Sequence, residues 1–241
     1  MLQYQNVFQR YEKKYLMDEQ QYQDLTKFLQ GKMISNEYGR HTICNIYFDT
    51  PDYRLIRASI EKPVYKEKLR LRSYGVPKKE DTVFVELKKK YKGVVYKRRV
   101  PLTLREAEQY LLQEKKLHKP SQILKEIDCF LDFYQPIIPM VYLAYERLAM
   151  CSNENPDLRI TFDNNIRWRQ SILDLARGVW GSPLLEAGQH LMEIKIPGAM
   201  PIWLSRGLSD LGIFPTSYSK YGNCYKKYLI HTTDLGGIQS A

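Results

Sequence analysis

Charged side chains recur at every second position in several extended segments of this 241-residue chain. In the stretch KLRLRSYG, Lys68, Arg70 and Arg72 alternate with other residues, and successive side chains of a strand point to opposite faces. Three cations therefore share one face of the predicted strand. Because arginine forks pair with phosphate oxygens and lysine acts as a point charge, such a row could bind a phosphate chain.

The same alternation occurs in segments on both sides of this strand. The residues concerned are Glu12 and Lys14; Glu86, Lys88 and Lys90; Lys97 and Arg99; Arg147; Arg159, Thr161 and Asp163; and Glu193 and Lys195. For one isolated antiparallel strand, a charged face in water is the simpler interpretation. The opposite faces of several of these strands are apolar, and helices are predicted nearby in the chain. We therefore expect helices to cover the apolar faces and the charged faces to point inward.

An antiparallel sheet with helices around it would position these faces. Apolar periodicity predicts strands over 8–16, 42–48, 64–74, 82–91, 93–102, 140–150 and 157–169, and within 184–198. Helices are predicted over 19–30, 104–115, 121–133, 201–212 and 215–230, with Asp18 and Thr103 as N-caps. The expected fold class is α+β, an eight-stranded antiparallel β-barrel with a basic interior surrounded by helices. We see no repeat or linker and predict one domain over 1–232, with 233–241 as a disordered tail.

Composition limits the classes of partner and compartment. The net charge of +10 favours a polyanion such as nucleic acid, an anionic membrane or a phosphate-rich small molecule. The four cysteines are far apart and form no CxxC pair, which argues against a zinc site and is typical of reduced cytosolic thiols. The N-terminus does not resemble a signal peptide, and the longest apolar stretch, 137–145, is too short to cross a bilayer. We therefore expect a soluble cytoplasmic protein.

A series of motifs resembles a known family. Nine motifs follow one another along the chain in this order: RYEKKYL, IYFDTPDYRLI, KLRLRSYG, VFVELKKK, YKRR, YERLAM, LRITFDNNIRW, MEIKIPG and SYSKYGNCYKKY. The series is similar to the VTC domain, the polyphosphate polymerase domain of the triphosphate tunnel metalloenzyme superfamily, over about residues 6–230. The resemblance implies a tunnel in which the γ-phosphate of ATP passes to a growing polyphosphate chain and ADP is released.

The resemblance also implies a set of site residues. The substrate-binding residues would be Lys14, Arg70, Arg72, Lys88, Lys97, Arg147, Arg159, Lys195, Ser219 and Lys220. The catalytic group would be Arg70, Arg72, Lys88, Arg147, Arg159 and Glu193, with Glu193 as the ligand of Mn²⁺ or Mg²⁺. Two positions depart from the family pattern. Arg10 occupies the first carboxylate position of the ExExK motif, which weakens any mechanism with two N-terminal metal ligands. Ser217 replaces a lysine, which predicts weaker polymer binding at one tunnel mouth.

Other functions remain open at this stage. In a tunnel triphosphatase, water would replace the polyphosphate acceptor; we favour transfer because the alternating faces are mostly Lys and Arg. A polyphosphate or nucleotide sensor without turnover is a third reading. Nucleic-acid binding is disfavoured because Tyr47, Tyr53, Tyr142 and Tyr145 lie in apolar contexts that indicate packing. The expected partners are ATP and inorganic polyphosphate. A membrane-associated partner that receives the product is also compatible with the sequence. The scattered histidines are not expected to be essential.

Overall fold

The computed structural model describes residues 7–8, 11–92, 94–117 and 121–230. Its strands are β1 (Val7–Phe8), β2 (Tyr11–Met17), β3 (Met33–Asp49), β4 (Tyr65–Tyr74), β5 (Thr82–Tyr91), β6 (Val94–Thr103), β7 (Ile138–Ser152), β8 (Arg159–Arg169), β9 (Ser182–Pro183), β10 (His190–Ile196) and β11 (Pro215–Thr216). The predicted strand over 42–48 is therefore only the second part of β3, which begins at Met33. The predicted tail, 233–241, lies outside the described residues.

The helices are α1 (Glu19–Leu29), α2 (Arg54–Ile60), α3 (Leu104–Leu112), α4 (Gln122–Phe133), α5 (Ile202–Asp210) and α6 (Lys220–Cys224), with a 3-10 turn, η1 (Leu175–Arg177), and a π-helical turn, η2 (Tyr225–Leu229). Both predicted N-caps are confirmed. Asp18 accepts a hydrogen bond from the N–H of Gln21, and Thr103 accepts one from the N–H of Glu106. In each case the side chain of the third helical residue bonds back to the cap, which fixes where the helix begins.

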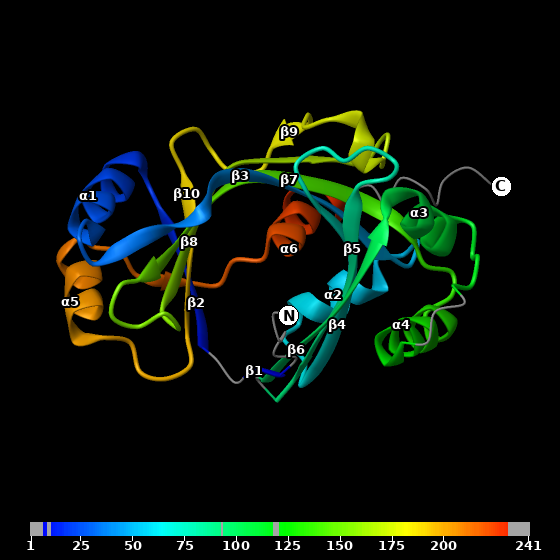
Figure 1. Ribbon diagram of the computed structural model, residues 1–241, viewed down its shortest axis with the longest axis horizontal. Helices are drawn as coiled ribbons and strands as arrows, with labels where there is room; N and C mark the ends of the chain where they lie inside the picture. Colours follow the sequence, from blue (N-terminus) through cyan, green and yellow to red (C-terminus); the bar gives the residue numbers. More distant parts are fainter. Residues whose placement is uncertain (1–6, 9–10, 93, 118–120, 231–241) are drawn as a thin grey trace.

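One antiparallel sheet runs through the molecule in the order β1-β6-β5-β4-β3-β7-β8-β10-β2-β11, with β9 paired to β8. The long strands β3 and β7 pair with each other and join two halves (Figure 1). One half is β4, β5 and β6 with α3 and α4 beside it, and the other is β8, β10 and β2 with α1 and α5. The sheet curves so that α2 and α6 lie within its concave side (Figure 1).

The sheet is open, so the expected closed barrel of eight strands is wrong in its closure. The count also differs, because the described residues form eleven strands, three of which have only two residues. The short strands at the two ends of the sheet explain the opening. β2 pairs with β10 on one side and with β11 on the other, at Pro215↔Tyr15 and Thr216↔Lys14. β6 pairs with β5 on one side and with the two-residue β1 on the other, so among the described strands no long one joins the two halves at this edge.

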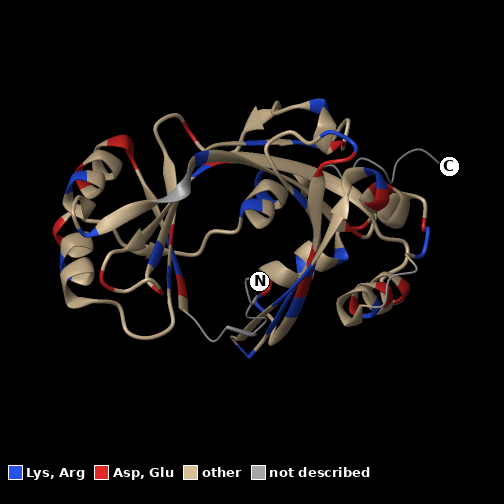
Figure 2. Ribbon diagram, in the orientation of Figure 1, with Lys and Arg blue, Asp and Glu red and all other residues tan. Residues whose placement is uncertain are grey.

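Apolar side chains attach the helices to one face of the sheet. Leu69 and Leu71 of β4 are buried in one core with Leu104 and Leu111 of α3 and with residues of α4, as the sequence predicted. Ile194 and Ile196 of β10 are buried in a second core with residues of α1 and α5. We call the opposite face, which α6 contacts, the inner face. Figure 2 shows Lys and Arg on both halves of the sheet and on α6.

Within the described residues, no helix has both the length and the apolar character that crossing a membrane requires.

Candidate functional site

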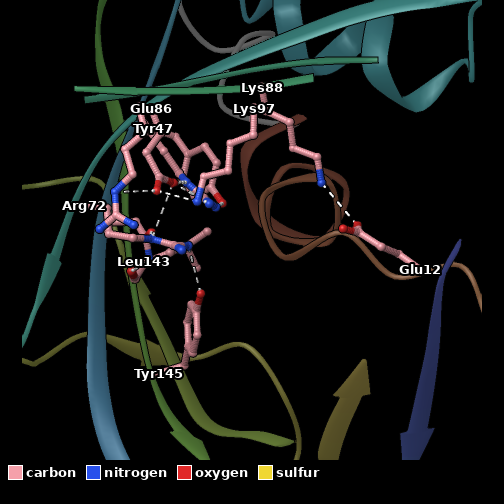
Figure 3. Close-up of polar contacts among 11 residues, drawn as sticks. Glu12, Tyr47, Arg72, Glu86, Lys88, Lys97, Leu143 and Tyr145 are labelled. Atoms are coloured by element: carbon pink, nitrogen blue, oxygen red, sulfur yellow. Dashed lines mark hydrogen bonds and ion pairs between the residues drawn. The ribbon is translucent and has the colours of Figure 1, made fainter. Parts of the chain in front are cut away.

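Four cations surround one buried carboxylate on the inner face of β4, β5 and β6. We call Arg70, Arg72, Glu86, Lys97 and Arg99 the Glu86 cluster. Figure 3 labels three of its members, Arg72, Glu86 and Lys97. Arg70 binds Glu86 Oε2 through Nε at 2.8 Å and Nη2 at 2.7 Å, and Lys97 Nζ lies 2.7 Å from Oε1. Nε of Arg72 and of Arg99 lie 3.8 Å and 3.7 Å from the carboxylate. All five side chains project from the same face, because Glu86 is the cross-strand partner of both Arg70 and Arg99, and Arg72 and Lys97 are two residues from these arginines.

Side chains of β3 and β7 hold two of these arginines in place. Arg70 Nη1 donates to the hydroxyl of Tyr47 at 3.1 Å. Arg72 donates through Nε to Asn45 Oδ1 at 2.9 Å and through Nη2 to the hydroxyl of Tyr145 at 3.1 Å. Tyr47 and Tyr145 are buried, as predicted, but their hydroxyls also orient the arginines. The prediction that they serve packing was therefore incomplete.

The charge state of the Glu86 cluster follows from burial and proximity. Burial alone would favour the neutral acid, but Arg70 and Arg72 hold the pKa of Glu86 well below its usual range. Burial lowers the pKa of Lys97 to about 8, although Glu86 opposes this. The carboxylate is thus ionised at neutral pH, and it is outnumbered by cations.

A second cluster lies on β7, β8 and α6, and we call Arg147, Asp163 and Lys220 the Asp163 cluster. Arg147 donates to both oxygens of Asp163, at 2.6 Å and 2.7 Å, and Lys220 Nζ donates to Oδ2. Burial opposes ionisation, but Lys220 and Arg147 lower the pKa of Asp163 to about 2. This carboxylate therefore has its cations in direct contact and fixes the position of Lys220.

Glu193 lies on β10, next to the Asp163 cluster. Lys195 Nζ is 3.0 Å from Glu193 Oε1, and Lys14 of β2 is the cross-strand partner of Glu193. Burial would raise the pKa of Glu193, but Lys195 and Lys14 hold it well below its usual range. Within the described ranges there is no group of three or more His, Cys, Asp or Glu side chains that could hold a metal ion. An ionised carboxylate fits a hard cation such as Mg²⁺ or Mn²⁺ when phosphate oxygens supply further ligands.

The start of α6 connects the two halves of the inner face. Lys68 Nζ of β4 donates to Ser219 Oγ at 3.1 Å, and Lys14 Nζ of β2 donates to the carbonyl of Tyr218 at 2.6 Å. The pKa of Lys68 is lowered to about 7, mainly by burial and further by the positive charges of Lys14 and Lys88. Burial lowers the pKa of Lys14 to about 8. Both lysines therefore lie in a crowded cationic environment.

A buried carboxylate on β3 positions α6. Asp49 is fully buried and accepts hydrogen bonds from the backbone N–H groups of Leu55 and Ile56 in α2. Its Oδ2 also accepts one from the hydroxyl of Tyr221 at 3.0 Å, and Tyr221 stacks on Tyr47. Because Tyr221 follows Lys220 directly, this contact fixes the helix that carries Ser219 and Lys220.

The structure places most of the predicted site residues on this inner face. Arg70, Arg72 and Lys97 belong to the Glu86 cluster, and Arg147 and Lys220 to the Asp163 cluster. Glu193 and Lys195 lie on β10 and Lys14 on β2, which follow β8 in the sheet order, and Ser219 is the N-cap of α6. Lys88 Nζ is 3.4 Å from Glu12 Oε2 on the far side of the open edge (Figure 3). Arg159 is exposed at the start of β8, where it pairs with Lys195 in register and donates to the carbonyl of Pro156. It is thus not drawn into either cluster.

The set of predicted site residues left out six residues that complete the site, although Lys68 had been named with Arg70 and Arg72 in the possible phosphate-binding row. The six are Asn45, Lys68, Glu86, Arg99, Tyr145 and Asp163. A signal existed for Lys68, Glu86 and Asp163, because each alternates with cations on a strand that was singled out. Asn45 and Tyr145 lie in apolar strand sequence and gave no such signal. Their contacts with Arg72 depend on the pairing of β3 with β4 and with β7.

Two solved structures share the fold. A putative adenylate cyclase from Bacillus halodurans has a TM-score of 0.58 at 16% identity, covering 93% of this chain and 99% of that one. A putative adenylyl cyclase from Hippeastrum, described as having a dominant triphosphatase activity, has a TM-score of 0.55 at 17% identity, covering 89% and 94%. At these identities the likeness shows the fold alone. No curated protein matches the sequence.

The family model of the VTC domain matches residues 9–229. This range includes β2, which carries Lys14, and α6, which carries Lys220, so both ends of the candidate site lie within the match. The chain therefore belongs to the VTC domain family, which is part of the triphosphate tunnel metalloenzyme fold family.

Proposed function

We propose that the protein is a metal-dependent polyphosphate polymerase, which transfers the γ-phosphate of ATP to inorganic polyphosphate and releases ADP. Membership of the VTC domain family supports this proposal, and so does the chemistry of the inner face. The proposed site residues are those predicted from the sequence, together with Lys68 and Arg99.

The excess of cations on the inner face is the observation that carries the proposal. Its described cations in or beside the two clusters are Lys14, Lys68, Arg70, Arg72, Lys88, Lys97, Arg99, Arg147, Lys195 and Lys220. The carboxylates among them are Glu12, Glu86, Asp163 and Glu193. Like charges at such density repel one another and favour a bound polyanion. A phosphate chain supplies that charge at a regular spacing.

Phosphoryl transfer requires little covalent chemistry from the protein. Arg70 and Arg72 would bind the triphosphate through their N–H forks, held at fixed angles by Tyr47, Asn45 and Tyr145. Lys68, with a pKa of about 7, would neutralise charge that develops on the transferred group. Glu193 would hold a divalent cation together with phosphate oxygens, and that cation would supply further charge neutralisation.

The reaction balances without a protein nucleophile. A terminal oxygen of the acceptor chain forms a bond to the γ-phosphorus of ATP, and the bond from that phosphorus to the β–γ bridging oxygen breaks. ADP leaves with the bridging oxygen, and the acceptor chain is one phosphate longer. The cations of the inner face would bind both negatively charged reactants, and in-line transfer requires the acceptor oxygen to lie opposite the bridging oxygen at the γ-phosphorus.

Hydrolysis of triphosphate is the second candidate function. Glu12 lies at the open edge, where its carboxylate faces Lys88 and its strand position pairs with Lys195. This places a second carboxylate one strand from Glu193, an arrangement that could orient a water molecule. The triphosphatase activity attributed to the Hippeastrum protein of the same fold agrees with this alternative.

Product analysis distinguishes the candidates. Purified protein would be incubated with ATP and Mn²⁺, with and without a short polyphosphate primer, and the products separated by gel electrophoresis and ion chromatography. A polymerase yields long polyphosphate and ADP in equal phosphate equivalents. Free phosphate or tripolyphosphate identifies hydrolysis, and bound but unchanged ATP identifies a sensor; either result contradicts the proposal.

We also propose a cytoplasmic location, where ATP is available and where the four free cysteines remain reduced. The proposed partners are ATP and inorganic polyphosphate, with no role for nucleic acid. Only two-residue strands, β1 and β11, are described at the open edge of the inner face. We propose that a membrane-associated protein receives the polymer at this edge.

A further inference from the structure

A group of rings lies at one end of the arginine row of β4. We define the aromatic cluster as His41, Tyr74 and Phe84. The ring centroids of Tyr74 and Phe84 are 5.8 Å apart in an edge-to-face arrangement, and those of His41 and Tyr74 are 6.0 Å apart. Tyr74 is 49% exposed although it is a large aromatic residue within the sheet. Its neighbours therefore leave much of its ring surface available to a ligand.

The aromatic cluster shares the inner face with the phosphate-binding candidates. Tyr74 is two residues from Arg72 along β4, so their side chains point to the same side. Phe84 is the cross-strand partner of Arg72 in the pairing of β4 with β5. His41 is the cross-strand partner of Arg147 in the pairing of β3 with β7. The rings are thus next to cations of both clusters.

Arg99 connects the rings directly to the Glu86 cluster. Its guanidinium carbon lies 3.3 Å from the ring centroid of Phe84 and 5.6 Å from that of Tyr74. Its Nε lies 3.7 Å from Glu86 Oε1. A phosphate bound by Arg99 and Arg72 would therefore be adjacent to an aromatic surface. A ligand that carries a phosphate chain and a flat π-system at one end, a nucleoside triphosphate, fits both features.

We propose that the aromatic cluster is the subsite that stacks the nucleobase of the donor nucleotide. This inference rests on the proposed function, in which ATP is the donor, and it adds what distinguishes ATP from inorganic triphosphate. Stacking on Tyr74 uses the face of the base, which adenine and guanine share, so the subsite favours nucleotides over inorganic phosphates more than one purine over another.

The subsite also sets the direction of the bound triphosphate. With the base at Tyr74, the phosphates run past Arg72 and Arg70 toward Lys68, since these residues follow one another on one face of β4. Beyond them, Lys66 lies directly opposite Lys90. Lys66 Nζ donates to the carbonyl of Ser59 at 3.1 Å, and an anion near this pair would offset the repulsion between the two like charges. The acceptor chain would therefore approach from the Lys66 end.

Binding measurements test the subsite without relying on turnover. Dissociation constants for ATP, GTP and inorganic triphosphate would be measured by calorimetry on the wild-type protein, Tyr74→Ala and Tyr74→Phe. We expect Tyr74→Ala to bind both nucleotides about tenfold more weakly and inorganic triphosphate with unchanged affinity. Tyr74→Phe, which keeps the ring, should bind all three as the wild type does. Tyr65→Ala is the matched control, because Tyr65 is 45% exposed at the other end of β4.

Three results would overturn the subsite: an equal loss for all three ligands, no loss for the nucleotides, or a wild-type protein that binds inorganic triphosphate but not ATP. Thermal unfolding of Tyr74→Ala shows whether an equal loss comes from damage to the fold. In that case Tyr74→Leu, which keeps an apolar side chain but no ring, gives the decisive comparison, since it should weaken nucleotide binding only. A failure of the polymerase proposal can be distinguished from a failure of the nucleobase subsite. A protein whose ATP affinity depends on Tyr74, but which makes no polyphosphate, keeps the subsite and loses the proposed reaction.

Discussion

The Glu86 cluster and the Asp163 cluster each combine arginine and lysine with a buried carboxylate, but in different proportions. Glu86 is approached by three arginines and a lysine, whereas Asp163 is contacted by Arg147 and Lys220. A carboxylate accepts about four hydrogen bonds, and each arginine has five N–H donors. The Glu86 cluster therefore has many more donors than its own carboxylate can accept. Its composition suits phosphate binding, and that of the Asp163 cluster suits the fixing of Lys220 and α6.

The largest effect is expected at the carboxylate beside the Asp163 cluster. Glu193→Gln keeps the size of the side chain and removes the charge that would hold the metal. We expect turnover of ATP to fall about 100-fold or more, with affinity for inorganic triphosphate measured without metal changed by less than a few-fold. Glu186→Gln, at an exposed carboxylate, is the control. Full activity in Glu193→Gln would remove the metal role from this residue.

The two arginine environments should respond differently to truncation. Arg72→Ala should weaken the binding of inorganic triphosphate by about 10- to 100-fold, because it removes charged hydrogen bonds to the ligand. Arg147→Ala should lower stability by about 3 kcal/mol, because it leaves Asp163 buried with only Lys220, and should weaken the binding of inorganic triphosphate less than Arg72→Ala does. Calorimetric binding and urea unfolding of both variants measure this. Equal losses of stability and affinity in the two variants would show that the clusters do not differ in role.

Affinity and stability should change in opposite directions with pH. The pKa of Lys68 is lowered to about 7, and those of Lys14 and Lys97 to about 8, in each case chiefly by burial. Phosphate prefers the protonated amines, so affinity for inorganic triphosphate should fall as pH rises from 6 to 9. Between these folded-state pKa values and the unfolded value of 10.5, the unfolded chain binds more protons, so stability should rise with pH. In Lys68→Arg, which stays charged, the fall in affinity should be smaller; an unchanged profile would exclude Lys68 as its source.

The smallest effect is expected from the contact that positions α6. Tyr221→Phe removes the hydroxyl that donates to Asp49, and Tyr110→Phe removes a comparable hydroxyl that donates to Asp128 between α3 and α4. Both should lose about 1 kcal/mol of stability. Only Tyr221→Phe should also weaken the binding of inorganic triphosphate, by about threefold, because Ser219 and Lys220 are displaced. Equal binding by the two variants would limit the Asp49 contact to a structural role.

Local sequence patterns could predict the directions of strand side chains but not the contacts between distant strands. Alternation placed Leu69 and Leu71 under helices and their basic neighbours on the inner face, because side-chain direction in a strand depends only on local geometry. Closure could not be predicted, since it depends on which strand occupies the edge of β2, and the two-residue β11 has no periodicity to detect. Asn45 and Tyr145 were missed for a similar reason: their roles arise from pairing between strands distant in sequence.

A crystal structure of the protein with inorganic triphosphate and Mn²⁺ would show whether the inner face binds a triphosphate chain at the Glu86 cluster. We expect phosphate oxygens within hydrogen-bonding distance of Arg70, Arg72 and Lys68, with the metal on Glu193. Triphosphate bound elsewhere, with the ion pairs of Glu86 undisturbed and no density on the inner face, would contradict this expectation.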